Sequence, residues 1–110
     1  MPSYPAAYPA ALYPGAVIPL VSATDSGVTT TAQFAIAPGM NGAGVTIMID
    51  NTTGQTATGQ WAATDVAGNY QNLSGCIVPA SSVLAYNLSG GWMRFTFSVA
   101  PTSGSLIVSR

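Results

Sequence analysis

From about residue 17 onward, the chain alternates apolar and polar residues in short runs separated by turn-forming residues. Such alternation places every second side chain on the same face of a strand, whereas an amphipathic helix repeats its apolar positions about every 3.6 residues. No segment follows the helical period. The pattern therefore predicts seven or eight short strands, which at a spacing of roughly 8–12 residues are typical of an all-β antiparallel β-sandwich or jelly roll.

The clearest predicted strand covers residues 92–99, because its odd-numbered positions are all apolar and its even-numbered positions form a different, mixed face. Residues 17–21 predict an edge strand, since Pro19 lacks the N–H that a central strand must donate. We expect residues 95–99 and 106–108 to pair as a closing hairpin. The other predicted strands are 28–36, 45–50, 57–64, 69–73, 77–78 and 83–88. The residues expected to form the core are Phe34, Ile36, Ile47, Ile49, Phe95, Phe97, Leu106 and Val108.

The first fourteen residues differ in composition and contain three Tyr-Pro steps. Each proline fixes its own φ and favours an extended preceding residue, so we expect an extended N-terminal arm over 1–16 and one β-sandwich domain over 17–110. Fully extended, the arm would reach on the order of 40 Å. Tyrosine combines a large apolar face with a polar tip, so the sequence predicts that the arm binds a partner; a loose terminus is the alternative. The residues expected to make this contact are Tyr4, Pro5, Tyr8, Pro9, Tyr13 and Pro14.

The chain is almost without charge. Charged residues make up 5% of it, the net charge is −1, and Lys, Glu and His are missing, whereas a typical domain is about 25% charged. So few charges give weak repulsion between copies and favour association. We therefore expect a surface largely covered in an assembly, with a homotrimer as the first expectation; a surface hydrated by Ser, Thr, Asn and Gly is the alternative.

The composition also excludes several classes of partner. No basic patch is present to release counterions from nucleic acid, so we expect no nucleic-acid binding. No run of 18 apolar residues occurs, and prolines interrupt the start of the chain where a secretory signal would need a continuous apolar stretch. We therefore expect neither a membrane span nor a targeting signal.

Catalysis by acid–base or nucleophilic groups needs a titratable side chain beside a second polar group. In a chain without His, Lys or Glu we expect no catalytic residue, no cofactor and no transition-metal site. Asp25 and Asp65 lie in turn-like sequences, where a carboxylate more often accepts backbone N–H bonds. Asp50 and Asn51 leave a calcium site open as an alternative, because calcium prefers oxygen ligands, although the spacing of an EF-hand is absent.

Three glycosylation sequons and a single cysteine do not indicate a functional site. Asn51, Asn72 and Asn87 each begin a glycosylation sequon, and we interpret them as loop or turn residues. Cys76 is the only cysteine and cannot form an intrachain disulfide. Its apolar neighbours predict a buried core residue, with a reactive or intermolecular thiol as the alternative.

One group of side chains suggests recognition. Trp92 and Arg94 share a face of their predicted strand, and Tyr70 and Trp61 are expected nearby. Aromatic faces beside Asn and Gln side chains suit a carbohydrate, and an Arg stacked on an aromatic ring is also common at protein interfaces. We expect an interface or a covered sheet face here, with a glycan site as the alternative.

Residues 59–73 and 91–99, followed by the terminal strand, resemble small β-sandwich virion proteins of tailed bacteriophages. In that family a strand leads into a turn with Asp and Gly, an aromatic residue follows, and a later strand carries an aromatic-x-Arg pattern. Asp65, Gly68 and Tyr70 match the turn, and Trp92 with Arg94 matches the later strand. The resemblance spans roughly residues 28–110, and the extended arm is similar to those with which phage decoration proteins grip a capsid or one another.

The resemblance implies a structural protein of the virion, on the capsid surface or in the tail. We expect a non-enzymatic capsid decoration or cement protein that binds itself and the major capsid protein, or another virion protein, through residues 1–16. A glycan- or receptor-binding module of a tail tip or fibre is one alternative. A tail-tube or filament subunit is another.

Overall fold

The structure is a computed structural model and describes residues 11–21, 29–37, 44–88 and 90–110. These residues form eight strands and one short 3₁₀ helix. The strands are β1 (Val17–Val21), β2 (Phe34–Ile36), β3 (Val45–Asn51), β4 (Ala57–Ala62), β5 (Gln71–Val78), β6 (Ser82–Leu88), β7 (Gly91–Phe97) and β8 (Leu106–Ser109). The helix η2 (Ala67–Asn69) lies between β4 and β5.

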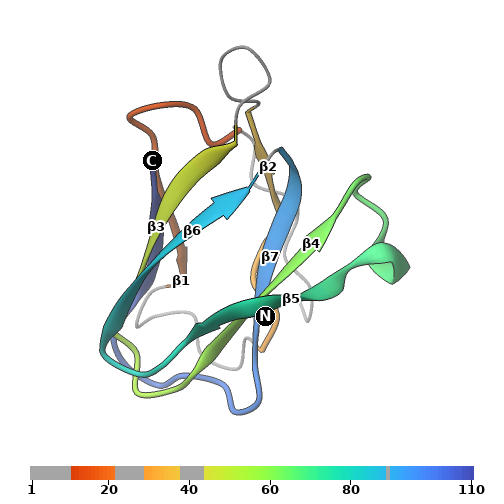
Figure 1. The fold of residues 1–110 in the computed structure, drawn as a ribbon. Coiled ribbons are helices and arrows are strands. Elements are labelled where there is room, and N and C mark those ends of the chain that lie inside the picture. The colour runs from red at the N-terminus through yellow and green to blue at the C-terminus, as the bar shows by residue number, and fades with distance from the viewer. Residues whose placement is uncertain (1–10, 22–28, 38–43, 89) are drawn as a thin grey trace.

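The strands form two sheets that pack face to face, as Figure 1 shows. The first sheet has the order β1-β8-β3-β6 and the second has the order β2-β7-β4-β5. Every pair is antiparallel, and the first strand pairs with the last, the second with the seventh, the third with the sixth and the fourth with the fifth. This nested pairing is that of a jelly roll. The predicted all-β sandwich is thereby confirmed.

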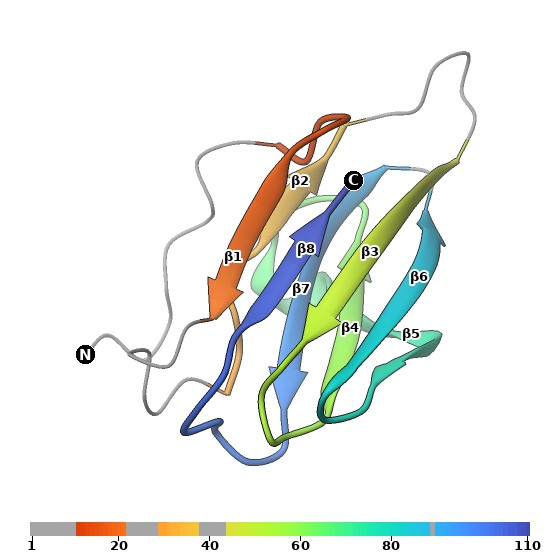
Figure 2. The same cartoon turned by 90° about the vertical axis from the view of Figure 1, so that its left-hand side faces the viewer.

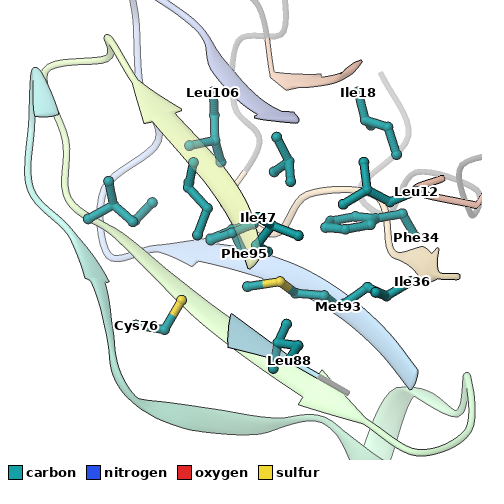
Figure 3. Close-up of a cluster of buried hydrophobic side chains, with 14 of the residues drawn as sticks. Leu12, Ile18, Phe34, Ile36, Ile47, Cys76, Leu88, Met93, Phe95 and Leu106 are labelled. Atoms are coloured by element: carbon teal, nitrogen blue, oxygen red, sulfur yellow. The ribbon is translucent and has the colours of Figure 1, made fainter. Parts of the chain in front are cut away.

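The core lies between the two sheets and consists of side chains at alternate strand positions (Figure 3). On β3 the buried positions are Val45, Ile47 and Ile49, because a period of two directs them all to one face. All eight residues predicted to form the core are buried. Sequence patterning therefore identified these inward positions correctly, whereas Val99, on the same apolar face of the predicted strand 92–99, lies beyond the end of β7 and is 57% exposed.

The predicted closing hairpin is wrong. β7 pairs with β2 and β4, whereas β8 pairs with β1 and β3, so the two strands belong to different sheets. Residues 98–105 connect one sheet to the other instead of making a tight turn. Two amphipathic strands joined by a turn bury their apolar faces equally well within one sheet or across two, and the pattern of each strand does not distinguish these cases.

The regular strand expected at 28–36 is interrupted. Thr30 makes an isolated bridge to Thr96, and regular pairing begins again only at β2. Between them, the buried Thr31 accepts the N–H of Phe95 on its Oγ1 at 3.0 Å, while its own N–H donates to the carbonyl of Phe95 at 2.9 Å. The hydroxyl thus satisfies a main-chain donor that a continuous ladder would have paired with a carbonyl.

Residues 11–16, which we expected to belong to the arm, pack against the sandwich. Leu12 is fully buried in the core and makes a parallel bridge to Ile36 of β2. Arg110 donates from Nη1 to the carbonyls of Leu12 at 2.8 Å and Ala37 at 2.9 Å. The carbonyl of Arg110 accepts the N–H of Gly15, and its own N–H donates to the carbonyl of Ala16. Residues 11–16 are therefore hydrogen-bonded to both sheets, to the second through β2 and to the first through Arg110, which follows β8.

Asn51 is the main buried polar residue of the domain, although we interpreted it as a loop residue. It is the last residue of β3 and is fully buried. Its Nδ2 donates to the carbonyls of Gln55, Val78 and Pro79 at 2.8–3.1 Å, and its Oδ1 accepts from the N–H and Oγ1 of Thr53. The side chain therefore joins the β3–β4 turn to the end of β5, which belongs to the other sheet.

The other two sequon asparagines are also strand residues, and the prediction that they lie in loops is wrong. Asn72 lies on β5 and Asn87 on β6, both exposed. Each is held by a cross-strand hydrogen bond, from Gln60 to Asn72 and from Asn87 to Thr46. Such polar pairs on the outer faces allow Asn in a strand despite its low strand propensity.

We expect the substitution Asn51→Asp to lower the free energy of unfolding by about 3 kcal/mol or more, because it places a buried carboxylate oxygen against carbonyl oxygens that now receive N–H donors. The matched control is Asn72→Asp, at an exposed position where the carboxylate still accepts from Gln60. Urea denaturation measures both. Equal stability of the two variants would show that the Asn51 network contributes little.

Candidate functional site

Two of the predicted recognition residues, Trp92 and Arg94, lie on the outer face of the sheet β2-β7-β4-β5. On β7 the side chains of Met93, Phe95 and Phe97 point into the core, so Trp92 and Arg94 lie on the opposite face. Cross-strand register places Arg94 beside Gln60 of β4. The sequence prediction that Trp92 and Arg94 share an outward face agrees with this register.

Arg94 is stacked on Tyr70. Its guanidinium carbon lies 4.3 Å from the centroid of the Tyr70 ring, within the range of a cation–π interaction. Its Nε donates to Oε1 of Gln60 at 2.8 Å. The structure therefore brings Tyr70 and Arg94 together, as expected, but in contact with each other rather than as two separate surfaces open to a ligand.

Tyr70 is held at its polar end as well. Its hydroxyl donates to Oδ1 of Asp65 at 2.9 Å, and Oδ2 of Asp65 accepts a longer bond from Nε2 of Gln33 at 3.4 Å. Tyr70 is only 6% exposed. The carboxylate of Asp65, which we interpreted as a turn cap, thus accepts from side chains of two other segments, and Oε1 of Gln33 is buried without a hydrogen-bond partner among the described residues.

Trp61 does not belong to this group. It lies on β4 opposite Met93, so its indole faces the core side of the sheet. Its Nε1 donates to the carbonyl of Gly90. The ring also covers Gly91, whose φ of +85° and lack of a β-carbon allow this close contact. Trp61 therefore has a structural role at the β6–β7 turn, and the sequence could not separate it from the outward Trp92.

Three observations limit what the cluster of Tyr70, Arg94, Asp65, Gln60 and Gln33 can do. One face of the Tyr70 ring is covered by Arg94, and the ring is almost fully buried. Its hydroxyl and the Nε of Arg94 already donate to protein acceptors. A sugar needs an open aromatic face and free polar groups, so Trp92, which is partly exposed, is the one aromatic side chain of the cluster face with surface to offer.

The residues of the arm are only partly within the described chain. Tyr13 is 60% exposed and Pro14 is exposed, in the turn that joins Leu12 to β1. The predicted contact residues Tyr4, Pro5, Tyr8 and Pro9 lie outside the described residues, as does Asp25. Tyr13 and Pro14, the two predicted contact residues that the structure describes, are therefore exposed next to the buried Leu12.

A calcium site at Asp50 and Asn51 is not supported by the geometry. Asp50 points outward from β3, whereas Asn51 points inward and uses its Oδ1 to accept from Thr53. Among the described residues, no group of three His, Cys, Asp or Glu side chains is placed to hold a metal ion. Adjacent strand residues point to opposite faces, so these two cannot coordinate the same ion with their side chains.

Cys76 is fully buried in the core, as predicted. Burial raises the pKa of its thiol from 9.0 to about 11, against a smaller opposing effect of a backbone hydrogen bond with Gly59. A β-carbon at Gly59 would collide with Sγ, so the glycine allows the thiol to fit under β4. Cys76 is therefore a packing residue and not a reactive nucleophile.

Sequence reasoning missed an apolar surface on the outside of the first sheet. We call it the outer apolar face and define it by Val17, Pro19, Met48, Val83, Ala85 and Ile107. Val17 and Val83 are 60% and 56% exposed, and Met48 is 42% exposed. The available signal was Met48, an apolar residue at an outward position of the predicted strand 45–50, but pairing between strands was needed to join these residues into one surface.

Comparison with protein-family models, with curated proteins and with solved structures gives no match to this chain. In the part of the chain that the structure describes, no helix has the length and apolarity needed to cross a membrane. The fold, the two outer faces and the arm are therefore the features of this chain that bear on its function.

The raised pKa of Cys76 predicts a specific pH dependence. The unfolded thiol ionises near pH 9.0 and the folded thiol near pH 11, so the stability that the neutral thiol contributes is fully present below pH 9 and is lost as the pH rises towards 11. We expect the wild-type chain to lose unfolding free energy over this interval relative to Cys76→Ala, as measured by denaturation at each pH. Parallel curves would contradict the buried, neutral thiol.

The outer face of the second sheet, which carries this cluster, should not bind sugars. We expect no saturable change in tryptophan emission when dextran, mannan or chitin oligosaccharides are added, because the Tyr70 ring is already covered. The control is Trp92→Phe, which removes the indole on the cluster face. Saturable quenching in the wild type that disappears in Trp92→Phe would contradict this prediction and favour the glycan alternative.

Proposed function

We propose that this chain is a non-enzymatic structural protein of a virion, a capsid decoration or cement protein that attaches and assembles through its Tyr-Pro arm. Its partners are other copies of itself, with a homotrimer as the simplest assembly, and the major capsid protein or another virion protein. Its location is the capsid surface or the tail. A tail-tube or filament subunit and a glycan-binding tip are the rival functions.

The observation that carries the proposal is the attachment of the arm to the domain. Leu12 is fully buried between the sheets, and Arg110 holds its carbonyl. The residues immediately after Leu12 form an exposed turn. A partner that binds residues 1–10 would therefore be connected, through the buried Leu12, directly to the core of the jelly roll.

The fold and the composition add support. Jelly rolls form many viral capsid and lectin domains, although fold alone does not determine function. The ionisable side chains of the described chain other than tyrosine and cysteine are Asp50, Asp65, Arg94 and Arg110. Arg94 and Asp65 form hydrogen bonds within the cluster, and Arg110 donates to the carbonyl of Leu12, where the arm joins the domain. Few charged groups therefore remain for catalysis, whereas an assembly surface needs none.

The structure changes how the arm should be tested. A deletion that extended to residue 15 would remove Leu12 and leave a cavity in the core, so loss of assembly could come from unfolding. Deletion of residues 2–10 keeps Leu12 and the bonds of Arg110. This shorter deletion separates binding by the arm from stability of the domain.

We expect deletion of residues 2–10 to abolish self-assembly in sedimentation velocity while far-UV circular dichroism and the melting temperature stay close to wild type. A matched variant of full length, Tyr4→Ser with Tyr8→Ser, should also weaken assembly because it removes the apolar rings and keeps the prolines. Undiminished assembly of the deleted chain would overturn the proposal.

A further inference from the structure

We propose that the outer apolar face of the first sheet is the docking site for the Tyr-Pro arm, residues 2–10, of a neighbouring copy. The inference rests on the proposed function and adds the surface that receives the arm. It joins two features of the chain: a segment that carries no charged side chain, and an exposed sheet face that is mostly apolar and carries one carboxylate.

The outer apolar face has members on all four strands, with one polar residue, Asp50 or Ser109, in each of its two rows. Cross-strand register places Pro19, Ile107, Asp50 and Val83 in one row, and Val17, Ser109, Met48 and Ala85 in the next. Figure 2 looks onto this sheet, with β1, β8, β3 and β6 side by side. Exposed apolar side chains that occur together in this way mark an interaction surface, whereas single ones do not.

The charge of the face favours the arm over a second copy of the same face. Asp50 is the only charged side chain at the outward positions of these four strands that the structure describes. A symmetric face-to-face pair would bring its carboxylate towards that of the partner and desolvate both. The arm carries no charged side chain, and the hydroxyls of Tyr4 and Tyr8 are donors that a carboxylate accepts.

The strand edges are less suitable for the arm than the face. Of the two edges of the first sheet, β1 and β6, the edge at β1 contains Pro19, which lacks a donor for an added strand. Of the two edges of the second sheet, β2 and β5, the edge at β2 already receives Leu12 from its own chain. A proline-rich segment also has few N–H groups with which to extend a sheet, so contact through side chains is the better use of its rings.

Direction and reach favour docking on a neighbouring copy. Leu12 bridges Ile36 of β2, at the edge of the sheet that does not carry the outer apolar face, so residues 2–10 are joined to the domain beside the opposite sheet. Nine extended residues reach about 28 Å. Four strands span only about 14 Å between the first and the last, so the arm is long enough to cross the whole face of a neighbour.

The test uses two full-domain variants that each lack one half of the contact. One has residues 2–10 deleted and keeps the face. The other, Met48→Glu, keeps the arm and places a charge in the centre of the face at a half-exposed position where folding tolerates it. The matched control is Ile77→Glu, a 54% exposed apolar residue on β5 of the other sheet.

We expect each of the first two variants to be monomeric alone, as measured by light scattering, and a mixture of them to form a complex with the mass of one copy of each. The arm of Met48→Glu then docks on the intact face of the deleted chain. Ile77→Glu should assemble as the wild type does.

Each other result overturns the inference in an identifiable way. Assembly of Met48→Glu alone, with the deleted chain still monomeric, would place the arm elsewhere and leave the proposed function standing. Two monomeric variants that do not combine would exclude docking between copies. Assembly of the deleted chain alone would overturn the proposed function as well, and loss of assembly in Ile77→Glu would move the contact to the other sheet.

Discussion

The close packing of two sheet faces, with Phe34 and Phe95 fully buried between them, is the interaction on which the rest of this molecule depends. A domain of this size has one modest core, and here that core also includes Leu12, from a segment whose sequence reads as an arm. The same apolar burial that holds the sheets together therefore fixes the point from which the arm leaves. Polar contacts reinforce this arrangement where the sheets meet, through Asn51 at one place and Arg110 at another.

The two outer faces of the sandwich expose different kinds of side chain, so they are not equivalent as binding surfaces. On the second sheet, Arg94 stacks on Tyr70 and Tyr70 donates to Asp65, while Trp92 is partly exposed and Ile77 is 54% exposed. On the first sheet, Met48 and its neighbours remain exposed around a single carboxylate. If the arm of one copy binds the outer apolar face of the next, successive copies are related in the same way along the assembly. The angle between neighbours then determines whether the copies close into a ring or continue as a filament.

Much of the fold could be predicted from the sequence, because alternation alone identifies which side chains face inward. All eight predicted core residues follow from that rule, and the burial of Cys76 was predicted from its apolar neighbours. The pairing of strands could not be predicted in the same way: β7 and β8 read as a hairpin, yet they belong to different sheets. Local pattern determines the face of each strand, whereas topology depends on contacts between residues far apart in the chain.

The candidate site was predicted less completely. The sequence placed Trp92 and Arg94 on one face, but it could not show that Arg94 covers Tyr70 or that Trp61 turns to the core side. The outer apolar face was not predicted, since its members come from four strands and meet only through register. Leu12 was assigned to the arm because short-range signals from the Tyr-Pro steps outweighed one apolar residue.

The measurement that tests this account most directly is the absolute mass of the full-length chain in solution, determined by light scattering over a range of concentrations. An adhesive arm and an exposed apolar face on the same chain predict that the chain assembles without any other protein, as a discrete small oligomer if the contacts close and as larger polymers if they do not. A chain that remains monomeric at every concentration would contradict the claim that its arm and its sheet face bind each other.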